Sequence, residues 1–192
     1  MTSRTDAELA QATLEGSEEA FGELVDRYRR PLFSLIVRMV REGTIAEDLC
    51  QETFVKAHRA LATYDQRRKF SSWLFKIGHN TTIDHLRRFK PPTQPLETQD
   101  EDSRSLSETL ADEVTLSPDL GVVGSELGDA LERCLAQLRP EYREVMVLRF
   151  MEGLAYQEIA DVMDVALGTV KTNIHRARKE LARMLIDEGW SP

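Results

Sequence analysis

The sequence has little cysteine and no long hydrophobic run. It contains two cysteines in 192 residues, Cys50 and Cys134, too few for a disulfide scaffold or a four-cysteine zinc site. We interpret both as small, buried apolar side chains. Residues 32–40 form an apolar stretch interrupted by Ser34 and Arg38, far short of the roughly 20 residues that span a bilayer. The N-terminal residues lead into no apolar segment, so we expect no secretory signal and a cytoplasmic protein.

Motifs of catalysis are also missing. The four histidines are scattered, and there is no HExxH motif, no glycine-rich phosphate loop and no serine or cysteine nucleophile motif. We therefore expect no enzyme, no cofactor, no metal site and no small-molecule substrate. Strand-like alternation of apolar and polar residues persists nowhere, whereas helical spacing recurs throughout, so we predict an all-α fold.

Charge is distributed unevenly along the chain. The net charge is −8, and residues 91–125 hold eight acidic residues against one basic residue. Residues 66–90 hold seven basic residues and one acidic residue, and residues 168–184 hold five and one. Two basic patches flanking an acidic segment indicate contact with nucleic acid, although a charged run can equally be a solvated helix face.

The prolines at 91, 92 and 95, together with the acidic segment after them, indicate an extended linker with too few apolar residues to form a core. We therefore predict two small helical domains joined by a flexible acidic linker. The predicted ranges are 1–92, 93–124 and 125–192.

In the first half we expect four helices. Ser17 starts one and Pro31 restarts the chain as a second, which ends near Gly43. The run 44–47 has the capping-box pattern and predicts a helix to about Leu61. A last helix, capped by Ser71, extends to about Lys90.

The second half predicts helices from Ser125, from Pro140 to near Gly153, and over 156–163 and 169–185. The last two have helix-turn-helix spacing. A small Ala160 suits the crossing of the two helices, and Val170 and Ile174 pin the second onto the first. Asp164 tolerates the left-handed turn, and Ala155 leaves the first helix without a side-chain cap.

Polar residues face outward on three of these helices. The outer face of the last helix suits a DNA major groove, or an ordinary helical hairpin with a basic exterior. An aromatic among bases on the helix after Ser71 could stack an unpaired base, unless Trp73 packs under the preceding loop. The face of the last helix comprises Thr169, Lys171, Thr172, His175, Arg176 and Lys179. The face of the helix after Ser71 comprises Trp73, Lys76, Asn80, Arg87 and Arg88. The face of the helix after Thr44 comprises Asp48, Gln51 and Glu52, and it either binds a partner or is only solvated.

Several motifs in order resemble a known family. The runs DLCQETF at 48–54, FSSWLFKI at 70–77, DHLRR at 84–88, GTVK at 168–171 and HRAR at 175–178 are similar to those of bacterial extracytoplasmic-function sigma factors of the sigma-70 family, sigma-E-like. The resemblance implies that the first domain is sigma region 2, which binds the clamp helices of the polymerase β′ subunit and opens the −10 promoter element. It implies that the second is region 4, which contacts the β-flap and reads the −35 element.

Carried onto this chain, the resemblance implies three sets of site residues. Asp48, Gln51 and Glu52 would contact core RNA polymerase. Single-stranded −10 DNA would be held by Tyr64, Arg67, Arg68, Lys69, Phe70, Trp73, Lys76, Asn80, Arg87 and Arg88. The −35 duplex would be read by Thr169, Lys171, Thr172, His175, Arg176 and Lys179.

The resemblance also implies a partner that restrains the protein. Members of the family are commonly held inactive by an anti-sigma factor, often anchored in the membrane, which would keep a cytoplasmic protein at the inner membrane until a stress or envelope signal. The acidic linker would follow the nucleic-acid channel of polymerase. The alternative is a stand-alone helix-turn-helix regulator, which predicts a sensory N-terminal domain with a ligand pocket or phosphoacceptor.

Overall fold

The structure, a computed structural model, describes residues 4–89 and 126–190. Every regular element in these two ranges is helical, which confirms the all-α prediction. The first half contains α1 (Asp6–Leu14), α2 (Glu18–Val40), α3 (Gly43–Ala60), the short 3-10 helix η1 (Leu61–Thr63) and α4 (Phe70–Phe89). The second contains α5 (Glu126–Gln137), α6 (Pro140–Met146), the π-helical turn η2 (Val147–Met151), α7 (Tyr156–Met163) and α8 (Leu167–Asp187). The predicted linker, 93–124, lies outside the described residues.

Helix α2 is continuous, and the predicted restart at Pro31 is wrong. Proline removes one helical hydrogen bond, yet the helix continues because residues on both sides of it lie on one buried face. Leu24 and Leu32 are fully buried on that face. The helix ends at Val40, and its C-cap is Arg41, which adopts the left-handed conformation with φ of 63° and donates its N–H to the Val37 carbonyl.

The predicted capping box at 44–47 is also wrong. Helix α3 starts at Gly43, and the cap is Glu42, whose carboxylate accepts the N–H groups of Thr44 and Ile45 at 2.9 and 2.8 Å. These bonds lower the pKa of Glu42. A charged acceptor at a helix N-terminus also gains from the helix dipole, so the longer acidic side chain caps in place of the threonine. Helix α4 likewise begins one residue before Ser71, at Phe70.

The helix-turn-helix pair forms as predicted. Helix α7 covers the predicted 156–163, and Asp164 makes the turn at φ 56°. The crossing residue Ala160 and the pinning residues Val170 and Ile174 are buried. Helix α7 lacks a side-chain cap at Ala155, whose N–H is instead bound by Glu158 at 2.7 Å.

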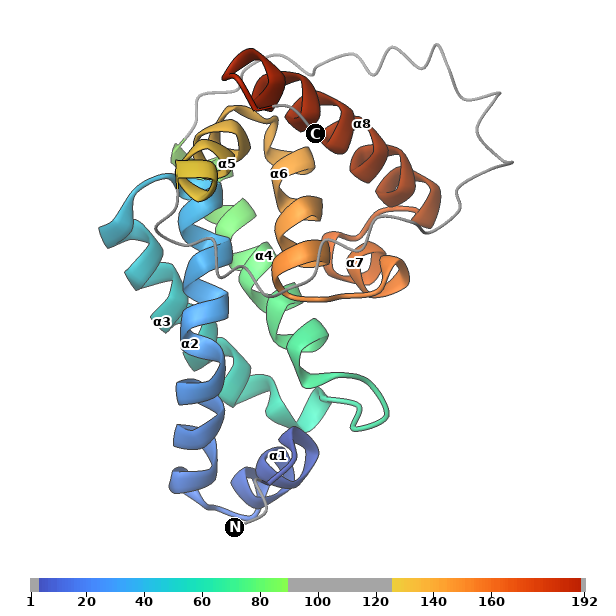
Figure 1. The fold of residues 1–192 in the computed structure, drawn as a ribbon. Coiled ribbons are helices and arrows are strands. Elements are labelled where there is room, and N and C mark those ends of the chain that lie inside the picture. The colour runs from blue at the N-terminus through green and yellow to red at the C-terminus, as the bar shows by residue number, and fades with distance from the viewer. Residues whose placement is uncertain (1–3, 90–125, 191–192) are drawn as a thin grey trace.

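The two halves pack against each other, which the sequence analysis did not predict. Helix α4 lies on α7 and α2 lies on α6 (Figure 1). One hydrophobic cluster includes Leu32 and Phe75 from the first half with Val145 and Ile159 from the second. The halves therefore share a core in this conformation.

Two buried polar groups of α6 cross this junction. The Glu144 carboxylate lies 2.5 Å from Nδ1 of His79 on α4. The Arg143 guanidinium donates to the Leu135, Ala136 and Leu138 carbonyls at the end of α5 and to the Arg38 carbonyl near the end of α2. Arg143 thus ties the C-terminal ends of two helices, one from each half.

Candidate nucleic-acid and polymerase interface

The acidic face of α3 is exposed. Asp48, Gln51 and Glu52 all face solvent, and Glu52 pairs with Lys56 one turn later at 2.8 Å. A cleft of about 480 Å³ lies beside this face between α2 and α3. Its lining is Val25, Arg29, Arg30, Phe33, Glu47, Cys50, Gln51 and Phe54. An exposed polar face next to an apolar cleft can receive an amphipathic helix of another protein.

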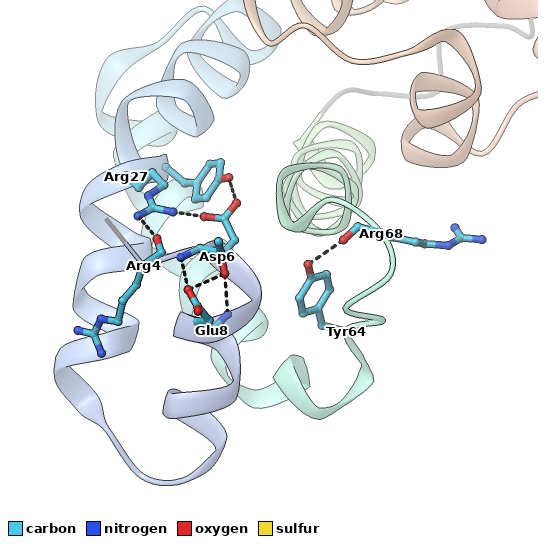
Figure 2. A network of polar contacts seen from close by, with 8 residues as sticks. Arg4, Asp6, Glu8, Arg27, Tyr64 and Arg68 are labelled. Carbon is cyan, nitrogen blue, oxygen red and sulfur yellow. Dashed lines mark hydrogen bonds and ion pairs between the residues drawn. The ribbon is translucent and has the colours of Figure 1, made fainter. Parts of the chain in front are cut away.

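The loop between η1 and α4, residues 64–69, is held in a defined shape. The Arg68 N–H donates to the Asp65 carbonyl at 2.9 Å, which closes a turn. The Tyr64 hydroxyl donates to the Arg68 carbonyl at 2.7 Å (Figure 2). The Asp65 carboxylate accepts both the backbone N–H and the guanidinium of Arg67, and these bonds lower its pKa to about 2. Hydrogen bonds among its own residues therefore hold the 64–69 loop in this shape.

The Tyr64 ring of the 64–69 loop belongs to a group of four packed aromatic rings, with Tyr28, Phe70 and Trp73, which we call the aromatic cluster. Phe70 contacts the other three at centroid distances of 5.3–5.4 Å, and Tyr64 and Trp73 lie 5.5 Å apart. These distances, with one edge-on pair and three tilted pairs, are typical of favourable aromatic packing.

This packing changes the status of two predicted −10 contacts. Phe70 is 1% exposed, so the structure removes it from the residues that can touch DNA in this conformation and makes it a support of the loop. Trp73 is half-buried against Tyr64 and Phe70. One part of its ring system therefore packs under the loop, as the alternative interpretation of Trp73 had it, while another part stays accessible.

Each basic side chain of the 64–69 loop has a carboxylate partner. Arg67 pairs within the loop, whereas Arg68 reaches Asp161 and Lys69 reaches Glu158, both at 3.1 Å. The last two acids lie on α7, in the other half of the chain. Sequence analysis missed this contact; the only signal was two acids three residues apart on the first helix of an otherwise basic helix-turn-helix.

The remaining predicted −10 residues lie along α4. Lys76 and Asn80 are exposed one turn apart, and Arg87 and Arg88 are exposed in the last turn. The loop and the exposed part of α4 thus give one surface with hydrogen-bonding, cationic and aromatic groups, the combination that holds single-stranded nucleic acid.

The predicted −35 residues lie on α8. Thr169, Lys171, His175, Arg176 and Lys179 are exposed, opposite the buried Val170 and Ile174. Thr172 is half-buried, and its hydroxyl donates to the Gly168 carbonyl at 3.0 Å. The exposed side chains of α8 are of the kinds that suit a DNA major groove.

Other site classes find no support in residues 4–89 and 126–190. No group of three or more His, Cys, Asp or Glu side chains in these ranges could hold a metal ion. No helix there is both long enough and apolar enough to cross a membrane. Both cysteines are buried, as predicted, and burial raises the pKa of Cys50 to about 11, which disfavours the reactive thiolate.

Two family models match separate segments of this chain. A model of "Sigma-70 region 2" matches residues 24–90, and a model of "Sigma-70, region 4" matches residues 128–181. The "ECF RNA polymerase sigma factor SigW" of Bacillus subtilis is 36% identical over 90% of this chain and 92% of its own length. The "RNA polymerase sigma-H factor" of Pseudomonas aeruginosa is 33% identical over 96% of both chains. The solved structure of CnrH in complex with the cytosolic domain of CnrY is 29% identical, with a TM-score of 0.66 over 95% of this chain and 97% of that one.

Proposed function

Because the chain belongs to the extracytoplasmic-function group of the sigma-70 family, factors that direct RNA polymerase to promoters, we propose how that work is divided along it. Residues 1–92 bind the polymerase clamp helices and open the −10 element. Residues 125–192 contact the β-flap and read the −35 element, and residues 93–124 connect the two. The single observation that carries this division is the placement of two separate basic faces, one per half, each within a segment matched by its own family model.

The stand-alone regulator that the sequence left open loses its main requirement. It needed a sensory first half, and residues 24–90 match sigma-70 region 2 instead.

The −10 step follows from the surface of the 64–69 loop and α4. DNA opening exposes bases that must leave their stack, at a cost of a few kcal/mol each. The accessible part of Trp73 stacks on such a nucleobase, and Asn80 reads the edge of that nucleobase. Lys76 and the basic side chains of the loop hold the neighbouring phosphates. A surface that accepts one base better than others turns the cost of unstacking into sequence selection.

The −35 step follows from α8. Lys171, His175 and Arg176 lie on consecutive turns of its exposed face, where they reach base edges or phosphates of one major groove. Neither half offers a large enough surface for tight binding alone, so specificity requires polymerase to present both halves together. We expect the isolated protein to bind promoter DNA weakly.

Polymerase docks on Asp48, Gln51 and Glu52. An anti-sigma factor covers such surfaces in the inactive state, a proposal supported by the similarity to CnrH, which was solved in complex with the cytosolic domain of CnrY. The protein works in the cytoplasm, where polymerase and chromosome meet; an anti-sigma factor with a membrane anchor would hold it at the inner membrane until a stress or envelope signal.

The decisive experiment is transcription in vitro with bacterial core polymerase on a genomic fragment library, with sequencing of the RNA 5′ ends. Transcripts should start downstream of one shared two-block motif. Arg176→Ala should weaken the sequence preference of the upstream block, and Asn80→Ala should weaken that of the downstream block. Arg183→Ala, which removes an exposed basic side chain elsewhere on α8, should change neither preference. Start sites without a shared motif would contradict the proposal.

Polymerase docking has its own test. Asp48→Ala with Glu52→Ala should weaken binding to core polymerase, whereas Glu19→Gln, an exposed acid on α2, should not. Equal affinity of both proteins for core polymerase would refute this assignment of the face.

A further inference from the structure

Helix α1 lies outside the segment matched by the region 2 model, which begins at residue 24. Even so, α1 is firmly anchored. Its Leu9 and Ala10 are buried in the main core, and Thr5 and Glu8 form a capping box at its start. A short exposed appendage would need neither.

Polar contacts lock the start of α1 onto α2 (Figure 2). The Asp6 carboxylate accepts the Tyr28 hydroxyl and pairs with the Arg27 guanidinium. Arg27 also donates to the Arg4 carbonyl at 3.0 Å, and the Arg4 guanidinium pairs with Glu23. These bonds fix where the rest of α1 lies relative to α2.

Two routes lead from α1 to the 64–69 loop. The direct route is one hydrogen bond at 3.0 Å, from the Gln66 amide nitrogen to the Gln11 amide oxygen. The amide nitrogen of Gln11 is itself held by Glu15 at 2.9 Å, which orients the oxygen toward the loop.

The second route runs through the aromatic cluster. Tyr28, held by Asp6, packs on Phe70 at 5.4 Å, and Phe70 meets Tyr64 edge-on at 5.3 Å. The Tyr64 hydroxyl then closes the loop by its bond to the Arg68 carbonyl. A displacement of α1 would therefore move both the tip of the loop and its two ends.

We propose that α1 positions the 64–69 loop for the capture of a nucleobase. Gln11 holds Gln66 at the tip of the loop, and Asp6 holds the two ends of the loop through Tyr28. This rests on the proposed −10 function of the loop. Capture of an unstacked base depends on a fixed pocket, because a loop that adapts to any base loses the ability to reject the wrong one. Gln11 and Asp6 are positioning residues that touch no DNA.

The test uses polymerase reconstituted with each variant and a forked DNA library with six randomised nucleotides in the unpaired non-template strand. Bound DNA is sequenced, and core affinity, melting temperature and binding of a duplex −35 library are measured in parallel. The variants are Gln11→Ala, Gln66→Ala, their double and Tyr28→Phe, which keeps the ring. Gln137→Ala, which removes an exposed glutamine on α5 that bonds to a carbonyl of its own helix, is the matched control.

We expect Gln11→Ala and Gln66→Ala each to lower the enrichment of the preferred base about two- to tenfold, the range set by one hydrogen bond. The double variant should lose no more than either single, because both remove the same bond. Tyr28→Phe should act in the same direction, and core affinity and −35 preference should stay at wild-type values.

The proposal is overturned if these variants keep the wild-type base profile, whether or not they melt earlier, since α1 would then have no effect on base capture. It is also overturned if the two single losses add fully in the double variant. A wild-type protein that enriches no base in the library contradicts the −10 function itself, and the proposal falls with it.

Discussion

Replacing Arg143 tests whether the two halves are held together as the structure indicates. The side chain is 4% exposed and donates to four backbone carbonyls, three at the end of α5 at 2.7–2.9 Å and that of Arg38 at 2.5 Å. Methionine fills similar space but donates nothing. The Leu135 carbonyl keeps a bond from the Leu138 N–H at 3.2 Å. Each buried carbonyl that is left unpaired costs about 1–3 kcal/mol, and this cost is partly offset because the buried charge is also removed. Burial already lowers the pKa of this guanidinium, so that offset is real.

We therefore expect Arg143→Met to lower the free energy of unfolding by about 3–5 kcal/mol, or about 8–15 °C in melting temperature for a chain of this size. Lysine keeps the charge but has three donors for four carbonyls and no planar fork, so Arg143→Lys should cost about 1–3 kcal/mol. Urea unfolding followed by circular dichroism measures both. Arg139→Met is the control: that residue is exposed, and its guanidinium carbon lies 6.0 Å from the centre of the Tyr142 ring. A loss below 1 kcal/mol in Arg143→Met would refute the reasoning.

Three further changes have defined outcomes. A Cβ at Gly78 would lie 2.6 Å from Cδ1 of the fully buried Leu32, so Gly78→Ala should destabilise by about 1–2 kcal/mol, whereas Gly22→Ala, in open space, should stabilise α2 by about 0.5–1 kcal/mol; equal melting shifts would contradict this. Burial raises the pKa of Glu152 to about 7, so between about pH 4.5 and pH 7 the folded state holds a proton that the unfolded state releases. The unfolding free energy of the wild-type protein should therefore fall relative to that of Glu152→Gln as the pH rises through this range. Parallel pH profiles of the two proteins in urea titrations would refute this prediction. Asp164 has a left-handed backbone that glycine adopts freely, so Asp164→Gly should raise the unfolding free energy by about 0.5–1 kcal/mol, and a lower melting temperature would count against it.

Local patterns predicted the local structure well. The bounds of α7, the turn at Asp164 and proline in the first turn of α6 follow from spacing and backbone preference within a few residues. The errors arise where a distant contact outweighs a local preference. Pro31 breaks a helix in isolation, but the buried face around it keeps α2 whole, and Glu42 caps α3 from outside the pattern that favoured Thr44.

The candidate site follows the same division. Which side of α8 is exposed could be predicted because the buried side is set by Val170 and Ile174 on the same helix. That Phe70 is buried could not, because the rings that cover it come from α2 and from the loop. The pairing of Lys69 with Glu158 joins residues 89 apart in sequence, and no periodicity carries that information.

Each basic side chain of the 64–69 loop must separate from a carboxylate of its own chain before it can bind a phosphate. Duplex and single-stranded DNA release condensed cations when phosphates are neutralised, which makes binding weaken steeply as salt is added. Here Asp161 and Glu158, once separated from Arg68 and Lys69, take up part of the counterion charge that the DNA gives off. The salt dependence of −10 binding should therefore be shallower than the number of phosphate contacts implies, and neutral amides at these two acids should make it steeper.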